Sequence, residues 1–88
     1  MAHRVEITNR AAQALVRIER GDRSAARRIT KSIGELAEDP RPPGAVKLTG
    51  LNAWRIRIGV YRVVYEIDDG VRVVEVVRVA HRRDVYER

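Results

Sequence analysis

The chain has 88 residues, 44% of them hydrophobic, which is enough for one compact domain but too few for two with separate cores. Lysine and arginine total 18 against 12 acidic residues, and this formal net charge of +6 favours a polyanion or an acidic protein as the partner. The absence of cysteine excludes disulfides, thiolate nucleophiles and cysteine-based metal sites. No stretch resembles a signal peptide or a membrane helix. We therefore expect a single cytoplasmic domain over residues 1–88, with no membrane association.

The first part of the chain predicts one strand and two helices. Residues 3–8 alternate apolar and polar side chains, as a short strand does. Thr8 or Asn9 can cap a first helix, and Asp22 is a natural N-cap for a second helix over about 23–38. Apolar residues recur at helical spacing in both segments: Ala11, Leu15 and Ile18, then Ala26, Ile29, Ile33 and Leu36. The tight turn between the two helices predicts that they are antiparallel.

The rest of the chain predicts three strands. Asp39 and Pro40 end the second helix, because a residue before proline is displaced from the helical conformation. A stiff, proline-rich connection over 40–46 follows. The strand-like runs lie at about residues 53–58, 60–67 and 71–79. Residues 68–70 (Asp-Asp-Gly) join the last two runs with hairpin chemistry, because Asp-Gly tolerates positive φ. The last run is too uniformly apolar for its faces to be assigned.

This order, β-α-α-β-β-β, predicts an α+β domain. We expect an antiparallel sheet with two antiparallel helices packed on one of its faces.

Positive charge is concentrated between Asp39 and Glu66, a segment without a single acidic residue. Its five cationic residues are Arg41, Lys47, Arg55, Arg57 and Arg62. A solvated surface usually interleaves both signs of charge, so this segment indicates a binding surface for an anion. Carboxylates from other parts of the fold could still neutralise it.

The run at 53–58 predicts that Arg55 and Arg57 share one face of a strand, opposite the apolar residues with which they alternate. Their backbone spacing is about 7 Å, close to the repeat between phosphates along a nucleic-acid strand. Each guanidinium can bind phosphate oxygens bidentately. Arg62 and Arg78, in the next two runs, could join the same basic surface. The alternative is a pair of solvent-facing arginines on an exposed sheet.

The C-terminal residues combine an imidazole, two fixed cations and a phenol, at His81, Arg82, Arg83 and Tyr86. Imidazole can transfer protons near neutral pH, and arginine can stabilise phosphoryl charge. Tyrosine can stack on a base. By itself this pattern is also typical of a solvated basic tail.

With these motifs in view, the sequence resembles the RelE/ParE toxin superfamily over nearly its full length. The segments that carry the resemblance are 39–42, 47–50, 54–59, 61–69 and 79–86. Their order and spacing together are more specific than any one of them. The β-α-α-β-β-β order is also the fold of that family.

The resemblance implies a toxin of a type II toxin–antitoxin system, specifically a RelE-type, metal-independent endoribonuclease that needs no cofactor. Such an enzyme cuts mRNA in the ribosomal A site and so inhibits translation. The ribose 2′-hydroxyl attacks the adjacent phosphate and leaves a cyclic phosphate. The implied partners are the ribosome, mRNA and a cognate antitoxin, which wraps the toxin and neutralises it in a hetero-oligomer.

The resemblance also implies roles for individual residues. The expected catalytic residues are Arg55, Arg57, Arg62, His81, Arg82 and Tyr86. Among these, Arg62 matches an arginine that stabilises the transition state, and Tyr86 matches a tyrosine that packs against the displaced base. Further RNA contacts are expected from Arg41, Lys47, Arg78 and Arg83. No metal site is expected.

One departure concerns Arg55 and Arg57, where some family members have lysines. Arginine stays protonated in proteins and is a poor proton donor or acceptor. General acid–base catalysis would then depend on His81, on Tyr86 or on the ribosome itself.

Two other functions remain open. A ParE-like toxin that inhibits DNA gyrase would share the same fold, so the fold cannot decide between them. The same scaffold could also be an inactive, antitoxin-binding module. The basic cluster and the C-terminal pattern favour the ribonuclease. A gyrase-directed toxin should damage DNA and leave mRNA intact.

Overall fold

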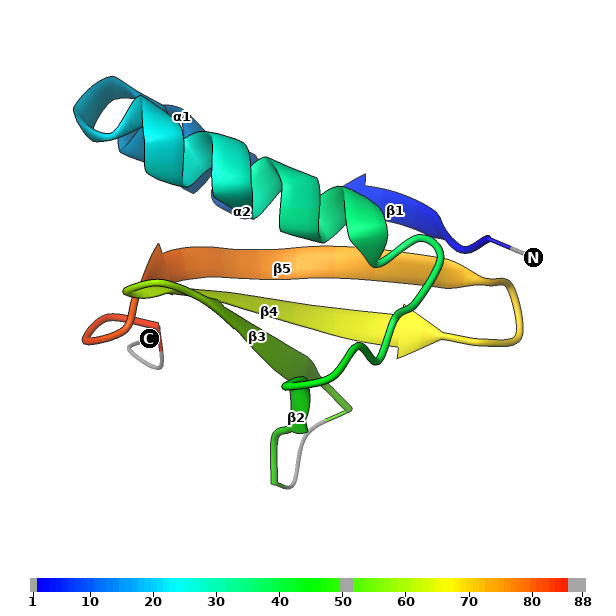
Figure 1. Ribbon diagram of the computed structural model, residues 1–88. Helices are drawn as coiled ribbons and strands as arrows, with labels where there is room; N and C mark the ends of the chain where they lie inside the picture. Colours follow the sequence, from blue (N-terminus) through cyan, green and yellow to red (C-terminus); the bar gives the residue numbers. More distant parts are fainter. Residues whose placement is uncertain (1, 50–51, 86–88) are drawn as a thin grey trace.

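The computed structural model describes residues 2–49 and 52–85. Two antiparallel helices pack on one face of a five-stranded sheet (Figure 1). The elements are β1 (Arg4–Ile7), α1 (Asn9–Gly21), α2 (Arg23–Glu35), β2 (Val46–Lys47), β3 (Trp54–Ile58), β4 (Tyr61–Asp68) and β5 (Val73–His81). No helix of the described residues covers the other face of the sheet, which we call the open face. None of the helices described is long and apolar enough to cross a membrane.

The predicted α+β fold is confirmed, with two differences in the sheet. Its strand order is β1-β5-β4-β3-β2, and β1 runs parallel to β5 while the other neighbours are antiparallel, so the sheet is mixed. The direction of β1 is not set by a hairpin turn, because the pair of helices lies between it and the rest of the sheet. The second difference is β2, whose two residues are too few to form a periodic pattern.

Both predicted helix caps are present. The side chain of Thr8 accepts a hydrogen bond from the backbone N–H of Ala11 at 3.3 Å, and that of Asp22 accepts one from Ala25 at 3.0 Å. These bonds satisfy N–H groups that a helix leaves without a partner at its start. The second helix ends at Glu35, earlier than the expected 38, and continues as hydrogen-bonded turns.

The core lies between the helices and the sheet. Its fully buried members include Ala11, Ile29, Leu36, Val63, Tyr65, Val74 and Val76. The hydroxyl of Tyr65 donates a hydrogen bond to the carbonyl of Pro40 at 2.6 Å. Burial raises the pKa of Tyr65 to about 12, so this hydroxyl keeps its proton. The bond fixes the proline-rich connection to the end of the core.

A β-bulge in β5 determines which way its side chains point. Val76 and Arg78 each have a partner in β4, whereas Val77 between them has none. Val76 and Val79 are both buried under the helices although they are three residues apart. The two residues between them therefore face the open side, where Val77 packs in a second, smaller apolar cluster. The bulge thus brings Arg78 to the open face, and it breaks the alternation that would have revealed the faces of this strand.

The turn from β4 to β5 differs from the expected Asp-Gly turn. One carboxylate oxygen of Asp68 accepts hydrogen bonds from the backbone N–H groups of Gly70 and Val71, at 2.9 and 3.1 Å. Arg72, with φ 59°, is the residue of this turn in the left-handed region, so Gly70 is not used for that purpose. The side chain of Asp68 shapes this turn more than the glycine does.

Candidate nucleic-acid interface

The backbone register brings four arginines to the open face of the sheet. Arg57 of β3 lies directly opposite Arg62 of β4. In the next row, Arg55 of β3 and Arg78 of β5 both pair with Val64. Directly paired residues point to the same face, and the residues that alternate with these arginines are buried under the helices. We call Arg55, Arg57, Arg62 and Arg78 the arginine face.

Arg57 and Arg62 place two like charges directly opposite each other in the sheet. Side chains directly opposite each other in an antiparallel pair interact, and like charges in these positions are destabilising. Local arrangements that break such a rule are typical of functional sites. The pair therefore marks the part of the open face nearest the β3–β4 turn as the candidate site.

Replacing Arg57 by threonine is expected to raise the free energy of unfolding by about 0.5 kcal/mol, because it removes the like-charge pair and threonine favours strands. Urea unfolding at low ionic strength measures this difference. In high salt the gain should shrink, because screening already weakens the repulsion in the wild type. A variant less stable than the wild type at low salt would contradict this account of the pair.

Arg62 is held in a fixed orientation. Its Nη1 donates hydrogen bonds to the carbonyl oxygens of Gly59 and Tyr61, at 3.0 and 2.9 Å. Gly59 has φ +58°, which a turn of this shape needs and which glycine adopts without strain. A guanidinium that is already positioned needs little reorganisation when it stabilises a developing charge.

Arg78 and the C-terminal residues complete the surface. Arg78 donates from Nη2 to the carbonyl of Asp84 at 2.6 Å, and its buried Nε has no hydrogen-bond partner among the described residues. The N–H of Arg82 donates to the carbonyl of Val60 at 2.7 Å, which places exposed Arg82 beside the β3–β4 turn. Val85, 3% exposed, packs in the smaller apolar cluster and holds the segment on the open face.

The other residues predicted near the C-terminus are Arg83, His81 and Tyr86. Arg83 is exposed, and its N–H donates to Nδ1 of His81 at 3.2 Å. The ring of His81 lies edge-on to Tyr61, with centroids 6.1 Å apart, and both residues share a row with buried Ile58. His81 is therefore on the helix side of the sheet, which argues against its acting together with the arginine face. Tyr86 lies outside the described residues.

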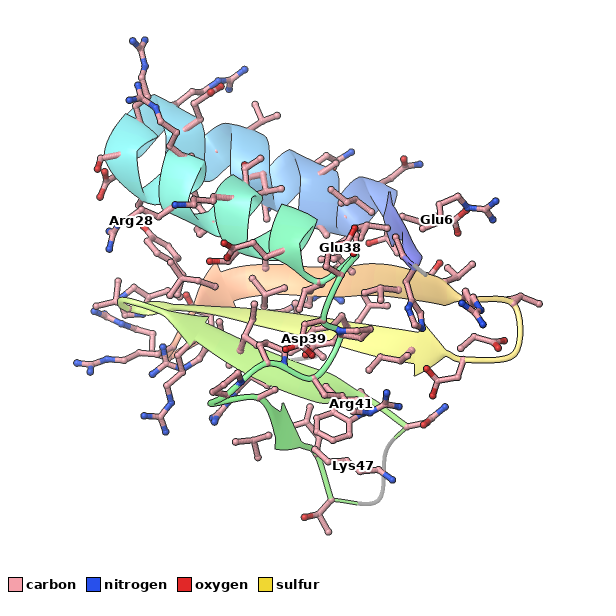
Figure 2. The ribbon with its side chains drawn as sticks, turned by 45° about the vertical axis from the view of Figure 1, so that its right-hand side comes forward. Glu6, Arg28, Glu38, Asp39, Arg41 and Lys47 are labelled. Atoms are coloured by element: carbon pink, nitrogen blue, oxygen red, sulfur yellow. The ribbon has the colours of Figure 1, made fainter. Side chains whose placement is uncertain are left out.

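Arg41 and Lys47 are not brought to the arginine face. Figure 2 shows both near the start of β3, at the end of the sheet away from Arg28. The Nη2 of Arg41 lies 2.9 Å from a carboxylate oxygen of Asp69, and its guanidinium lies 5.2 Å from the ring centroid of Trp54. In the structure, Arg41 thus forms an exposed intramolecular ion pair, and its contact with RNA stays a prediction. Lys47 is exposed on β2.

The contacts of Asp69 predict a weak acid dependence of stability. Its hydrogen bonds to Arg41 and then to His3 hold the pKa of this carboxyl below its usual range. A carboxylate with a lowered pKa in the folded state stabilises the fold at higher pH, and this contribution is lost as pH falls through the lowered pKa. Asp69→Asn is expected to reduce the urea midpoint at neutral pH and to match the wild type in strong acid. A constant difference between the urea midpoints of the variant and the wild type at every pH would contradict this assignment.

The comparisons with known proteins assign the family. The model of the ParE toxin of type II toxin–antitoxin systems matches residues 5–86. The chain belongs to this toxin family. It is a toxin of a type II toxin–antitoxin system, within the RelE/ParE toxin superfamily, as its sequence motifs indicated. No curated protein matches its sequence significantly.

Solved structures share the toxin's fold. A chain of the archaeal RelE–RelB complex from Pyrococcus horikoshii OT3 is 25% identical, with a TM-score of 0.81, covering 97% of this chain and 100% of that one. A double arginine-to-alanine mutant of E. coli RelE in the free state is 26% identical, with a TM-score of 0.76, covering 92% and 84%. A YoeB/ParE toxin from Agrobacterium tumefaciens, at 19% identity and a TM-score of 0.77 over 89% and 96%, supports the fold alone.

Two features of the toxin's surface were missed by sequence reasoning. The guanidinium of Arg28, on α2, lies over Gly59 at the β3–β4 turn (Figure 2). At the other end of the open face, three glutamates occupy one row across β1, β5 and β4: Glu6, Glu75 and Glu66. We call them the glutamate row. They line an open hollow of about 690 Å³. No signal in the sequence places any of these residues, because each depends on pairing between distant elements.

Candidate metal ligands do not cluster in the described parts of the toxin: no three His, Asp or Glu residues there could hold a metal ion together.

Proposed function

We propose that the toxin is a RelE-type endoribonuclease that cuts mRNA in the A site of the ribosome and thereby inhibits translation. The observation that carries this proposal is the arginine face, in particular Arg62, which lies opposite Arg57 and is oriented by the carbonyls of Gly59 and Tyr61. A basic surface of this kind, on an exposed sheet without a helical cover, fits a single strand of RNA better than a small-molecule substrate.

The proposed chemistry requires fixed positive charge. Attack by the 2′-hydroxyl on the adjacent phosphate forms one P–O bond, breaks the bond to the 5′-oxygen of the next nucleotide, and leaves a 2′,3′-cyclic phosphate. Charge increases on the phosphoryl oxygens as the attack proceeds, and preoriented guanidiniums stabilise it. In this proposal Arg57 and Arg62 bind the scissile phosphate, Arg55 and Arg78 bind its neighbours, and exposed Arg82 and Arg83 bind RNA beside them.

Proton transfer must come from outside the arginine face, because arginines stay protonated. Tyr86 or the ribosome would remove the proton of the 2′-hydroxyl and protonate the leaving oxygen. If the ribosome supplies one of these groups, a dependence on the ribosome follows directly, since isolated toxin would lack part of its acid–base machinery.

We also infer a cognate antitoxin as the partner of this toxin. Related structures are described as complexes of toxin and antitoxin, such as RelE with RelB. The net charge of +6 favours an acidic antitoxin segment that covers the basic face and neutralises the toxin.

A second candidate, inhibition of DNA gyrase in the manner of ParE, is favoured by one observation: the matching family model is that of the ParE toxin. The fold is common to both functions and does not separate them. An inactive, antitoxin-binding module would have the same arginine face, because this face also suits an acidic antitoxin segment, so only activity assays separate it from the ribonuclease.

Parallel assays of purified components separate these functions. In one, the toxin is added to ribosomes programmed with a defined mRNA; in the other, it is added to DNA gyrase with relaxed plasmid. We expect cleaved mRNA and normal supercoiling. Intact mRNA with blocked supercoiling would replace this proposal by the gyrase function, and no effect in either assay would favour the inactive module.

A further inference from the structure

The open face of the toxin carries positive charge at one end of its strands and negative charge at the other end. The arginine face lies toward the β3–β4 turn, and the glutamate row lies toward the β4–β5 turn. Arg62 and Glu66 are four residues apart on β4, or about 13 Å along the strand. This spacing exceeds the Debye length of about 8 Å at physiological salt, so each group of charges acts mainly on the part of a polyanion that lies next to it.

Arg28, on α2 in the helix layer, adds a further positive charge next to the positive end of this face. A Cβ placed on Gly59 would lie 3.6 and 3.8 Å from Nη1 and Nη2 of Arg28, so its guanidinium lies against the turn. Arg62 contacts the carbonyl of the same glycine at 3.0 Å. Two guanidiniums, one from the helices and one from the open face, thus meet at one residue of the turn.

The position of Arg28 suits a ligand contact. It is exposed, and within the described residues it forms no ion pair. Figure 2 shows it reaching from α2 toward the β3–β4 turn, with Glu6 at the opposite end of the molecule. Since Arg28 forms no ion pair with the described residues, its guanidinium can bind a phosphate of a polyanion that passes over the turn.

We propose that a single strand of RNA on the arginine face leaves it over the β3–β4 turn, where Arg28 binds one further phosphate, and does not extend across the glutamate row. This rests on the proposed function, in that the polyanion is RNA. The RNA would therefore lie in one orientation relative to the sheet. The toxin would contact a longer segment of it on the side of the β3–β4 turn than on the side of the glutamate row.

The test is binding of 2′-O-methyl RNA oligonucleotides of increasing length, which cannot be cleaved because the attacking hydroxyl is blocked. Fluorescence anisotropy at several salt concentrations gives the affinity and its salt dependence. Arg28→Gln is compared with Arg27→Gln, which makes the same charge change on the same helix beside Glu19, Arg23 and Lys31, away from the turn. A double variant, Glu66→Gln with Glu75→Gln, is compared with Glu35→Gln on α2.

We expect Arg28→Gln to weaken binding about fivefold and to reduce the slope of log K against log salt by about 0.7, the loss of one single-strand phosphate contact. Arg27→Gln should change neither. The double glutamate variant should bind long oligonucleotides more tightly, with little change for short ones, whereas Glu35→Gln should not discriminate by length.

Arg57→Gln separates the failure of this inference from that of the proposed function. If Arg57→Gln weakens binding while Arg28→Gln behaves like Arg27→Gln, the path over the turn is wrong and the arginine face stands. If Arg57→Gln has no effect, both are overturned. A loss for Arg28→Gln only in binding to an antitoxin, with RNA affinity unchanged, would also overturn the path and assign Arg28 to a protein interface.

Discussion

Arg62→Ala is expected to lower the rate of mRNA cleavage on ribosomes by roughly 100-fold or more. Removing one preoriented donor from a site that stabilises a developing anion typically costs a factor of this size. Arg62 is the member of the arginine face whose orientation is fixed by two backbone carbonyls, Gly59 and Tyr61. Single-turnover cleavage, with toxin in excess over programmed ribosomes, measures the rate without a contribution from product release.

Arg23→Ala is a suitable control for this loss, because it removes the same charge from the start of α2, outside the open face. It should cleave at nearly the wild-type rate. Both variants should stay folded under the assay conditions, which urea unfolding checks, because neither side chain is part of the apolar core. Equal rates for Arg62→Ala and Arg23→Ala would remove Arg62 from the mechanism.

Leu36→Ala is expected to lower the free energy of unfolding by about 3 kcal/mol. Leu36 is fully buried at the C-terminal end of α2, where it joins the helices to the sheet. For a domain of this size, such a loss corresponds to a fall in Tm of roughly 15 °C, and it removes a large part of the total stability. Thermal and urea unfolding followed by circular dichroism measure it.

The matched change at an exposed site is Val16→Ala, since Val16 is 48% exposed on α1. We expect this variant to be within about 0.5 kcal/mol of the wild type. If Leu36→Ala were equally mild, the core between helices and sheet would not provide the main stabilisation of the fold.

Local interactions explain which parts of the fold were predictable. The caps Thr8 and Asp22 are recognisable because each side chain bonds a backbone N–H three residues away. The faces of β5 were not, because Val76, Val77 and Val79 have the same side chain and only pairing with β4 decides which of them is buried. The parallel pairing of β1 with β5 likewise joins residues from opposite ends of the chain.

In the candidate site, too, the features set by local interactions were predictable and those set by distant residues were not. Arg55 and Arg57 were predicted correctly to share a face, because their spacing along one strand is sufficient. The ion pair of Arg41 was not predicted, because its partner Asp69 is 28 residues away and no local pattern indicates that pair. The contact of Arg28 with the turn at Gly59 is equally distant in sequence, and it joins two layers of the fold.

The central claim, that the toxin cleaves mRNA on the ribosome, is tested most directly by primer extension on one mRNA with ribosomes stalled at a defined codon and with ribosomes omitted. We expect cuts within the codon in the A site only when ribosomes are present, with 2′,3′-cyclic phosphate ends on the upstream fragments. Intact mRNA in both reactions, with toxin that binds its antitoxin normally, would contradict the claim.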